Sequence, residues 1–144
     1  MKLKHLFAGI FVLLPFAYAA WVYPSLPTTI PIHFNMEGKA DGWGSRESIF
    51  IGPAILGFVS FFVYLLMINI RKIDPKRYEG ADDKVYAQFG LFLVAFLSVL
   101  SLVIILSAVN QGKWIFITFM LILAVMVIAP LIHSFTFFKR QKKA

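Results

Sequence analysis

The sequence predicts an all-α integral membrane protein with four antiparallel transmembrane helices and one structured extracytoplasmic loop. Of its 144 residues, 60% are hydrophobic and 15% are charged, whereas a soluble domain usually carries about 25% charged residues. The apolar residues form long runs, and a helix of about 20 such residues crosses a hydrocarbon core of about 30 Å. We expect a single membrane domain, residues 1–144, with spans at about 6–23, 49–70, 85–109 and 114–138, an outer loop at 24–48 and an inner connector at 71–84.

The first span is the shortest of the four, and Pro15 interrupts it. In lipid, a proline inside a helix is tolerated as a kink when neighbouring groups satisfy the freed carbonyl. A cleaved signal peptide is the alternative interpretation, because a basic start and an apolar stretch precede the segment Ala17-Tyr18-Ala19. We favour a retained span, because the apolar run continues beyond this segment to Val22.

The outer loop is the longest polar, turn-rich stretch of the chain. Prolines push the residues before them toward extended geometry, and the alternating pattern of Ile30–Phe34 predicts a short strand on the membrane surface. Residues 35–45 contain three glycines and the turn pair Asp41-Gly42, and they predict a compact turn. We expect Ser45 to cap the second helix.

The later elements are separated by short polar segments. Gly52 and Pro53 are expected to reset the first turn of the second span. Pro75 and Gly80 break the helix in the inner connector. We interpret this connector as a solvated linker, and a docking site for a cytoplasmic regulator is the alternative. A tight link at residues 110–113 joins the last two spans.

The orientation is predicted from Lys and Arg, which are enriched on the cytoplasmic side of membrane proteins. Eleven of the 14 basic residues lie at one set of helix ends and three at the other. We therefore place both termini and the connector in the cytoplasm, in a multi-pass protein of the cytoplasmic membrane. Trp21, Trp43 and Trp114 all fall at the outer boundary, where tryptophan is favoured. The lipid bilayer accounts for the basic charge, so we expect no nucleic-acid partner.

The loop segment LPTTIPIHFNMEGKADGWGSR, residues 26–46, resembles the signature of domain of unknown function 1648, a small bacterial membrane module. The family pattern is Pro-x-His-Phe, then Gly, then Asp-Gly-Trp/Tyr-Gly-Ser-Lys/Arg. The matching positions are Pro31, His33, Phe34, Gly38, Asp41, Gly42, Trp43, Ser45 and Arg46. The resemblance covers about residues 10–70.

This family also occurs as the N-terminal membrane module of the immunity protein against the sporulation-delaying toxin of bacilli. The resemblance implies a protein that protects its producer and signals by holding a transcriptional repressor at the membrane. The chain differs by stopping after four predicted spans, so we expect the additional carboxyl-terminal membrane domain to be absent. The implied partners are the lipid bilayer, a peptide toxin or another membrane protein, and a cytoplasmic regulator.

The candidate ligand-binding residues lie in the outer loop. They are His33, Phe34, Asn35, Glu37, Asp41, Trp43 and Arg46. His33 and the two carboxylates have groups that ligate divalent cations or exchange protons, but their spacing matches no established metal motif. We interpret His33 and Asp41 as hydrogen-bond partners of each other or of the loop backbone, which lock the turn. We therefore assign no metal, no cofactor and no catalytic residue.

Polar residues within the predicted spans lie toward the cytoplasmic side. Asn69, Gln88 and His133 form a candidate intramembrane polar cluster, held by interhelical hydrogen bonds. No Asp, Glu, Lys or Arg lies inside a span, whereas a transporter usually keeps such a residue in its pathway. The chain has no Cys, which excludes disulfides and thiolate nucleophiles.

Three functions stay open at this point. We favour a non-enzymatic bacterial membrane binding or immunity-signalling module whose outer loop recognises a peptide or an envelope component. The first alternative is an accessory or structural subunit of a larger membrane complex. The second is a small metal-assisted membrane enzyme centred on His33, Glu37 and Asp41.

Overall fold

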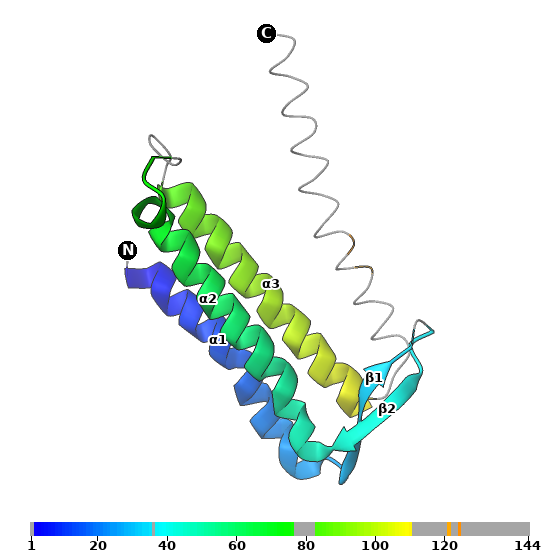
Figure 1. Cartoon of the computed structure of the whole chain (residues 1–144). Coiled ribbons are helices and arrows are strands. Elements are labelled where there is room, and N and C mark those ends of the chain that lie inside the picture. The colour runs from blue at the N-terminus through cyan, green and yellow to red at the C-terminus, as the bar shows by residue number, and fades with distance from the viewer. Residues whose placement is uncertain (1, 36, 77–82, 111–120, 122–123, 125–144) are drawn as a thin grey trace.

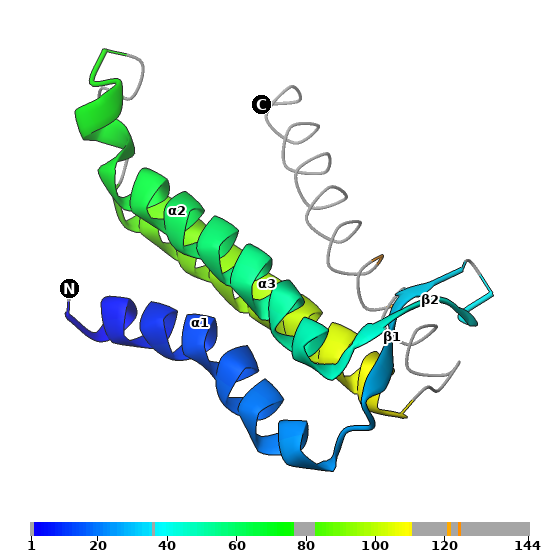
Figure 2. The ribbon, with the colours of Figure 1, turned by 60° about the horizontal axis from the view of Figure 1, so that its bottom comes forward.

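Three long helices run side by side, and a β-hairpin lies across one end of the bundle (Figure 1, Figure 2). This computed structural model describes residues 2–35, 37–76, 83–110, 121 and 124. The elements are α1 (Lys2–Val22), η1 (Tyr23–Ser25, a 3-10 helix), β1 (Thr29–Phe34), β2 (Ala40–Ser45), η2 (Arg46–Phe50, a 3-10 helix), α2 (Ile51–Ile73) and α3 (Asp83–Asn110). The end of α1, the beginning of α2 and the end of α3 lie near the hairpin, so successive helices run in opposite directions (Figure 1).

The first three predicted spans are confirmed as helices. Those long and apolar enough to cross a membrane are Leu3–Ser25, Arg46–Ile73 and Asp83–Asn110. This arrangement is consistent with a multi-pass membrane protein. The fourth predicted span, residues 114–138, lies outside the described residues apart from Leu121 and Ala124.

Both described ends of the predicted connector are helical rather than linker. α2 continues through Arg71 and Lys72 to Ile73, and α3 begins at Asp83. These charges suit their positions, because cations are favoured at a helix C-terminus and anions at an N-terminus. The charged residues at the edges of the apolar runs therefore lie inside the two helices, which continue beyond the predicted spans.

The polar loop forms a two-stranded antiparallel sheet, so the all-α prediction is wrong in this region. The strand predicted at Ile30–Phe34 is confirmed within β1. Residues 40–45, which the turn signals assign to a compact turn, form β2 instead. Ser45 is the extended last residue of β2, and it makes no side-chain capping bond to η2. Turn residues predict a reversal, but they do not show where the returning chain meets its partner strand.

The helices pack through small residues. A Cβ added to Gly90 of α3 would lie 2.9 Å from the Cβ of Met67 in α2. At Gly57 of α2, an added Cβ would lie 3.2 Å from the ring of Phe16 in α1. The small buried residues on the helices are Ala8, Ala19, Ser60, Ala87, Ser98, Ser101, Ser107 and Ala108. Such residues let helices approach closely in lipid, where packing rather than apolar burial drives association.

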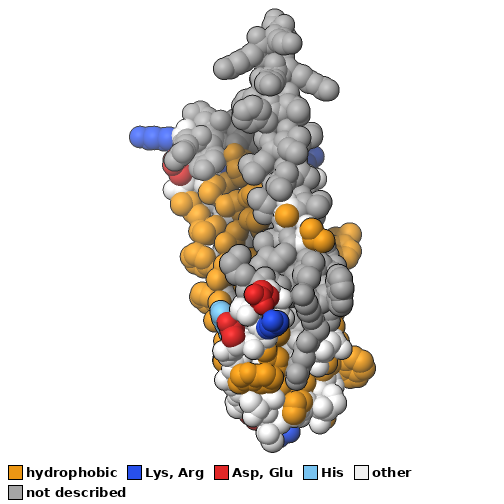
Figure 3. Space-filling view, turned by 90° about the vertical axis from the view of Figure 1, so that its right-hand side faces the viewer, with side chains coloured by type: hydrophobic (Ala, Val, Ile, Leu, Met, Phe, Trp, Pro, Cys, Tyr) orange, Lys and Arg blue, Asp and Glu red, His pale blue; other side chains and the backbone are white. Residues whose placement is uncertain are grey.

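The outward faces of the helices are apolar. Leu13, Ile55 and Phe58 are among many large hydrophobic side chains that are exposed within the described part of the chain, and Figure 3 shows apolar side chains along one face of the bundle. Soluble monomers rarely expose such extensive apolar surface. Lipid contact accounts for it.

Two apolar clusters hold the described bundle together. At the hairpin end, buried residues from α1, η2 and α3 meet the hairpin, and the cluster consists of Ala19, Val22, Leu26, Ile30, Ile49, Ile105 and Ala108. At the other end, Ala8, Tyr64 and Val94 pack together. The Tyr64 hydroxyl there lies 2.9 Å from Nδ1 of His5, which links α1 to α2. The first of these clusters fixes where the hairpin sits.

We predict that Gly90→Ala lowers the free energy of unfolding by about 1–3 kcal/mol, because the added methyl overpacks the contact with Met67. Gly9→Ala is the matched control, since it also replaces a helical glycine but adds its methyl where no atom lies within 4 Å. Unfolding of both variants in mixed micelles measures the difference. Equal stability of the two would contradict the close packing of α2 and α3.

Candidate functional site

The two strands of the hairpin approach closely where Gly42 faces His33. A Cβ at Gly42 would lie 2.8 Å from the Cβ of His33, so only glycine fits without moving the backbone. The pairing is irregular on both sides of His33, between Pro31 and Phe34. Such an irregularity bends a strand and re-aims its side chains. This local geometry presents the His33 side chain at the surface beside β2.

The hairpin tip is built around Asn35. Its side-chain oxygen accepts hydrogen bonds from the amides of Glu37 (3.0 Å) and Lys39 (2.9 Å). Its backbone N–H donates to the Lys39 carbonyl at 2.9 Å, and its carbonyl accepts from the N–H of Gly38 at 2.9 Å. Gly38 has φ 74°, a left-handed conformation that glycine adopts without steric cost. The predicted ligand residue Asn35 therefore shapes the turn.

His33 and Asp41 face each other across the strands. Nδ1 of His33 lies 2.5 Å from Oδ1 of Asp41, and their side chains are 72% and 42% exposed. Glu37 instead pairs with Lys39 at 3.0 Å. Within the described residues, no group of three or more His, Asp or Glu side chains is placed to hold a metal ion.

The base of the hairpin is joined to α1 through Tyr23. The Tyr23 hydroxyl donates to Oε1 of Glu47 at 3.1 Å, and the Arg46 guanidinium carbon lies 4.9 Å from the centre of the Tyr23 ring. The backbone N–H of Arg46 donates to the Thr28 carbonyl at 3.0 Å. The predicted ligand residue Arg46 thus forms part of this joint. The sequence does not predict the contact between Tyr23 and Glu47, because nothing in their spacing shows that they meet.

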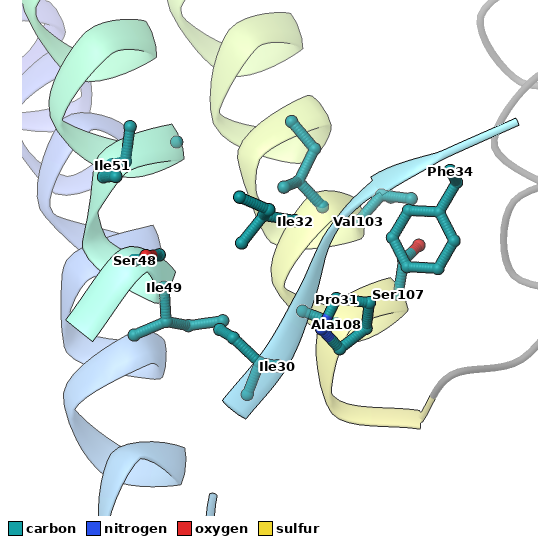
Figure 4. Close-up of a pocket in the computed structure, with 12 residues that line it drawn as sticks. Ile30, Pro31, Ile32, Phe34, Ser48, Ile49, Ile51, Val103, Ser107 and Ala108 are labelled. Carbon is teal, nitrogen blue, oxygen red and sulfur yellow. The ribbon is translucent and has the colours of Figure 1, made fainter. Parts of the chain in front are cut away.

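An apolar cavity of about 390 Å³ lies between β1 and the helices (Figure 4). We call it the hairpin groove. It is lined by Ile30, Pro31, Ile32 and Phe34 of β1, by Ser48, Ile49, Ile51 and Gly52 of η2 and α2, and by Val103, Ile104, Ser107 and Ala108 of α3. Ligand pockets typically measure about 300–1,000 Å³ and are mostly apolar with a few polar groups. In size and composition, the groove suits a small apolar ligand or a few apolar side chains of a peptide.

The structure gathers only part of the predicted binding set at the groove. Phe34 lines it. Trp43 lies on β2 opposite Pro31 and is 53% exposed. The alternation of Ile30, Ile32 and Phe34 was the sequence signal for a strand, but the facing wall from α3 lies more than 60 residues away in sequence and carries no motif.

The predicted intramembrane polar cluster has two described members. The Asn69 side-chain amide donates to the Leu65 carbonyl of its own helix at 2.9 Å. Gln88 is exposed near the start of α3. His133 lies outside the described residues. In the described part of the chain, Asn69 makes a bond within its own helix rather than one between helices.

Comparison with known proteins finds a family match in the part of the chain that includes the hairpin. The family described as Domain of unknown function (DUF1648) matches residues 10–57, which run from α1 through the hairpin into α2. An "Uncharacterized protein" from Archaeoglobus fulgidus is 35% identical over 63 residues, covering 40% of this chain and 34% of the relative. The chain thus spans about a third of that relative's length. No solved structure matches the chain.

We predict that Thr29→Cys with Ser45→Cys forms a disulfide across the base of the hairpin. These residues pair across the strands, and the neighbouring bond from Arg46 to Thr28 makes theirs a non-hydrogen-bonded pair, whose Cα atoms lie about 4.5 Å apart. That separation suits a disulfide. The protein contains no other Cys, so loss of free thiols on mild oxidation reports the bond directly.

Thr29→Cys with Ala40→Cys is the control, because Ala40 lies at the other end of β2, five residues before Ser45 and about 16 Å from it at 3.3 Å per residue. Crosslinking of the control pair as fast as the first pair would contradict the observed register.

Proposed function

We propose that this chain is a non-enzymatic bacterial membrane protein whose hairpin recognises a peptide or an envelope component in an immunity or signalling role. The observation that carries the proposal is the hairpin groove, an apolar cavity beside a hairpin whose tip and base are both held by hydrogen bonds. A preformed site loses little conformational entropy on binding. The cavity is apolar enough to take apolar side chains from a membrane-active peptide.

The polar residues at the hairpin support binding rather than chemistry. His33 is paired with Asp41, and Glu37 with Lys39, so these carboxylates do not converge on one point. The second alternative, a metal-assisted enzyme centred on this loop, gains no support from this arrangement. The exposed ion pairs instead offer a polar rim beside the apolar groove.

In this proposal the hairpin faces the outside of the bacterial cytoplasmic membrane, and the N-terminus and C-terminus lie in the cytoplasm. The uneven distribution of basic residues supports that orientation. Trp21, at the hairpin end of α1, is 76% exposed, as an interfacial anchor would be. The cytoplasmic segment between α2 and α3 would then contact a regulator when the hairpin binds its ligand.

An accessory role in a larger membrane complex is the second candidate. Phe58 and Phe62 of α2 are both exposed, and their rings stack with centroids 6.4 Å apart. Such an ordered aromatic pair suits a flat contact with another transmembrane helix. Co-purification of a stoichiometric membrane partner in mild detergent, lost on Phe58→Ala with Phe62→Ala, would favour this candidate over the first.

We predict that a deletion strain is sensitised to at least one secreted membrane-active peptide and that the wild-type gene restores resistance. Ile32→Ser should reduce protection about tenfold or more, because Ile32 lines the groove and full burial of such a side chain is worth about 1.5–3 kcal/mol. Ile73→Ser is the matched control, since Ile32 is 54% and Ile73 is 58% exposed, but Ile73 ends α2 far from the hairpin. The readout is the inhibitory peptide concentration at equal protein levels by immunoblot.

An unchanged inhibitory concentration across a broad peptide panel would remove the immunity role. Equal loss of protection in the two variants would remove the groove from the mechanism.

The orientation gives a separate prediction. Lys39→Cys at the hairpin tip should react with a membrane-impermeant maleimide in intact spheroplasts, whereas Lys76→Cys, just after α2, should react only after lysis. Both lysines are exposed, and the chain has no other thiol, so accessibility alone decides the result. The opposite pattern would invert the topology and exclude an external ligand for the hairpin.

A further inference from the structure

A second, much smaller cavity lies where the three helices meet, away from the hairpin groove. Its volume is about 10 Å³. It is lined by Phe11, Val12 and Pro15 of α1, by Pro53, Leu56, Gly57 and Ser60 of α2, and by Leu97, Ser98 and Ser101 of α3. A cavity needs roughly 10–15 Å³ to hold one water molecule. This space therefore admits one water and nothing larger.

Two serine hydroxyls at this cavity are buried without a partner in the described structure. Ser98 is 6% exposed and Ser101 is 1% exposed, and neither Oγ makes a hydrogen bond. Ser60, on the facing helix, does have a hydrogen-bond partner, because its hydroxyl donates to the Gly57 carbonyl of its own helix at 2.9 Å. Serines in helices commonly bond to a carbonyl of the preceding turn in this way. Ser98 and Ser101 do not, so their hydroxyls stay available at the cavity.

Pro15 supplies a third polar group that needs a partner. Proline has no amide hydrogen, so the carbonyl of Phe11, four residues earlier, loses its usual helical donor. The ring of a helical proline is directed toward that same carbonyl, and both Pro15 and Phe11 line the cavity. In lipid, carbonyls freed by proline are satisfied by neighbouring helices, Ser or Thr side chains, or ordered water.

We propose that one ordered water occupies this cavity and bridges the Phe11 carbonyl to the hydroxyls of Ser98 and Ser101. A buried water typically makes two to four hydrogen bonds, and these three groups supply that number. The water donates to the Phe11 carbonyl and exchanges hydrogen bonds with the two hydroxyls. It satisfies both buried serines and the proline-freed carbonyl at once, and it ties α1 to α3.

Whether a double serine substitution lowers or raises the stability of the protein tests for the bridging water. Replacing both hydroxyls, Ser98→Ala with Ser101→Ala, removes two of the water's three partners. We expect the folding equilibrium constant in micelles to fall roughly threefold or more, the size of an average interhelical hydrogen bond. A dry cavity predicts the opposite sign, because the substitution would remove two unsatisfied hydroxyls. Unchanged or raised stability would overturn the proposal.

Two further variants separate the bridge from a general loss of packing. Pro15→Ala restores the amide hydrogen for Phe11, so the cost of the double serine substitution should shrink in that background. Ser60→Ala is the control, since its hydroxyl bonds within α2 and its cost should not depend on Pro15. If the double substitution costs the same in the wild-type chain as in the Pro15→Ala variant, the bridge is overturned.

A direct observation covers the case in which Pro15→Ala fails to fold. An experimental structure of the wild-type chain at better than about 2 Å should show a solvent peak within hydrogen-bonding distance of both hydroxyls and the Phe11 carbonyl. An empty cavity, with each serine bonded to its own helix, would refute the proposal.

Discussion

The position of the hairpin depends on the apolar cluster that joins β1 to η2 and to the ends of α1 and α3. Ile30 is 1% exposed and packs in one group with Ile49 and with Ile105 of α3. A two-stranded hairpin by itself is at best marginally stable in water, whereas full burial of one isoleucine contributes about 1.5–3 kcal/mol. The hairpin is therefore ordered by its contact with the helices. The groove beside it exists because the same contact leaves Ile32 and Phe34 facing α3 across a gap.

The second constraint is the low polarity of the surroundings of the helices. Lipid tails are as apolar as the side chains on the outward faces, so the helices gain little by burying those side chains against one another. They meet instead at glycine, alanine and serine, where Gly90 lies against Met67 and Gly57 against Phe16. The same constraint makes each unpaired polar group in the bundle costly. For this reason the two buried serine hydroxyls near Pro15 need a hydrogen-bond partner.

The hairpin separates structural polar residues from an apolar binding surface. Asn35 organises the tip, His33 pairs with Asp41, and Arg46 packs at the base near Tyr23. Of these residues, His33, Asp41 and Arg46 belong to the motif that resembles the DUF1648 family, and the family match ends soon after α2 begins. These three motif positions accordingly help the hairpin to keep its shape, whereas the motif positions Pro31 and Phe34 line the groove. Recognition is proposed for the apolar hairpin groove, where a substitution would leave the hydrogen bonds of the turn in place.

The sequence by itself determined the helical spans at α1, α2 and α3 and the strand at β1, because these follow from local composition and spacing. It left open whether His33 and Asp41 bond to each other or to the loop backbone, and the structure pairs them with each other. Only the tertiary structure decided that residues 40–45 return as a strand, that α3 closes one side of the groove, and that Pro15, Ser98 and Ser101 meet at one cavity. The first depends on where the chain meets β1, and the other two depend on which helix faces come together. The close fit of small residues between the helices determines which faces meet. The positions of small residues in the sequence do not show which helix they will contact.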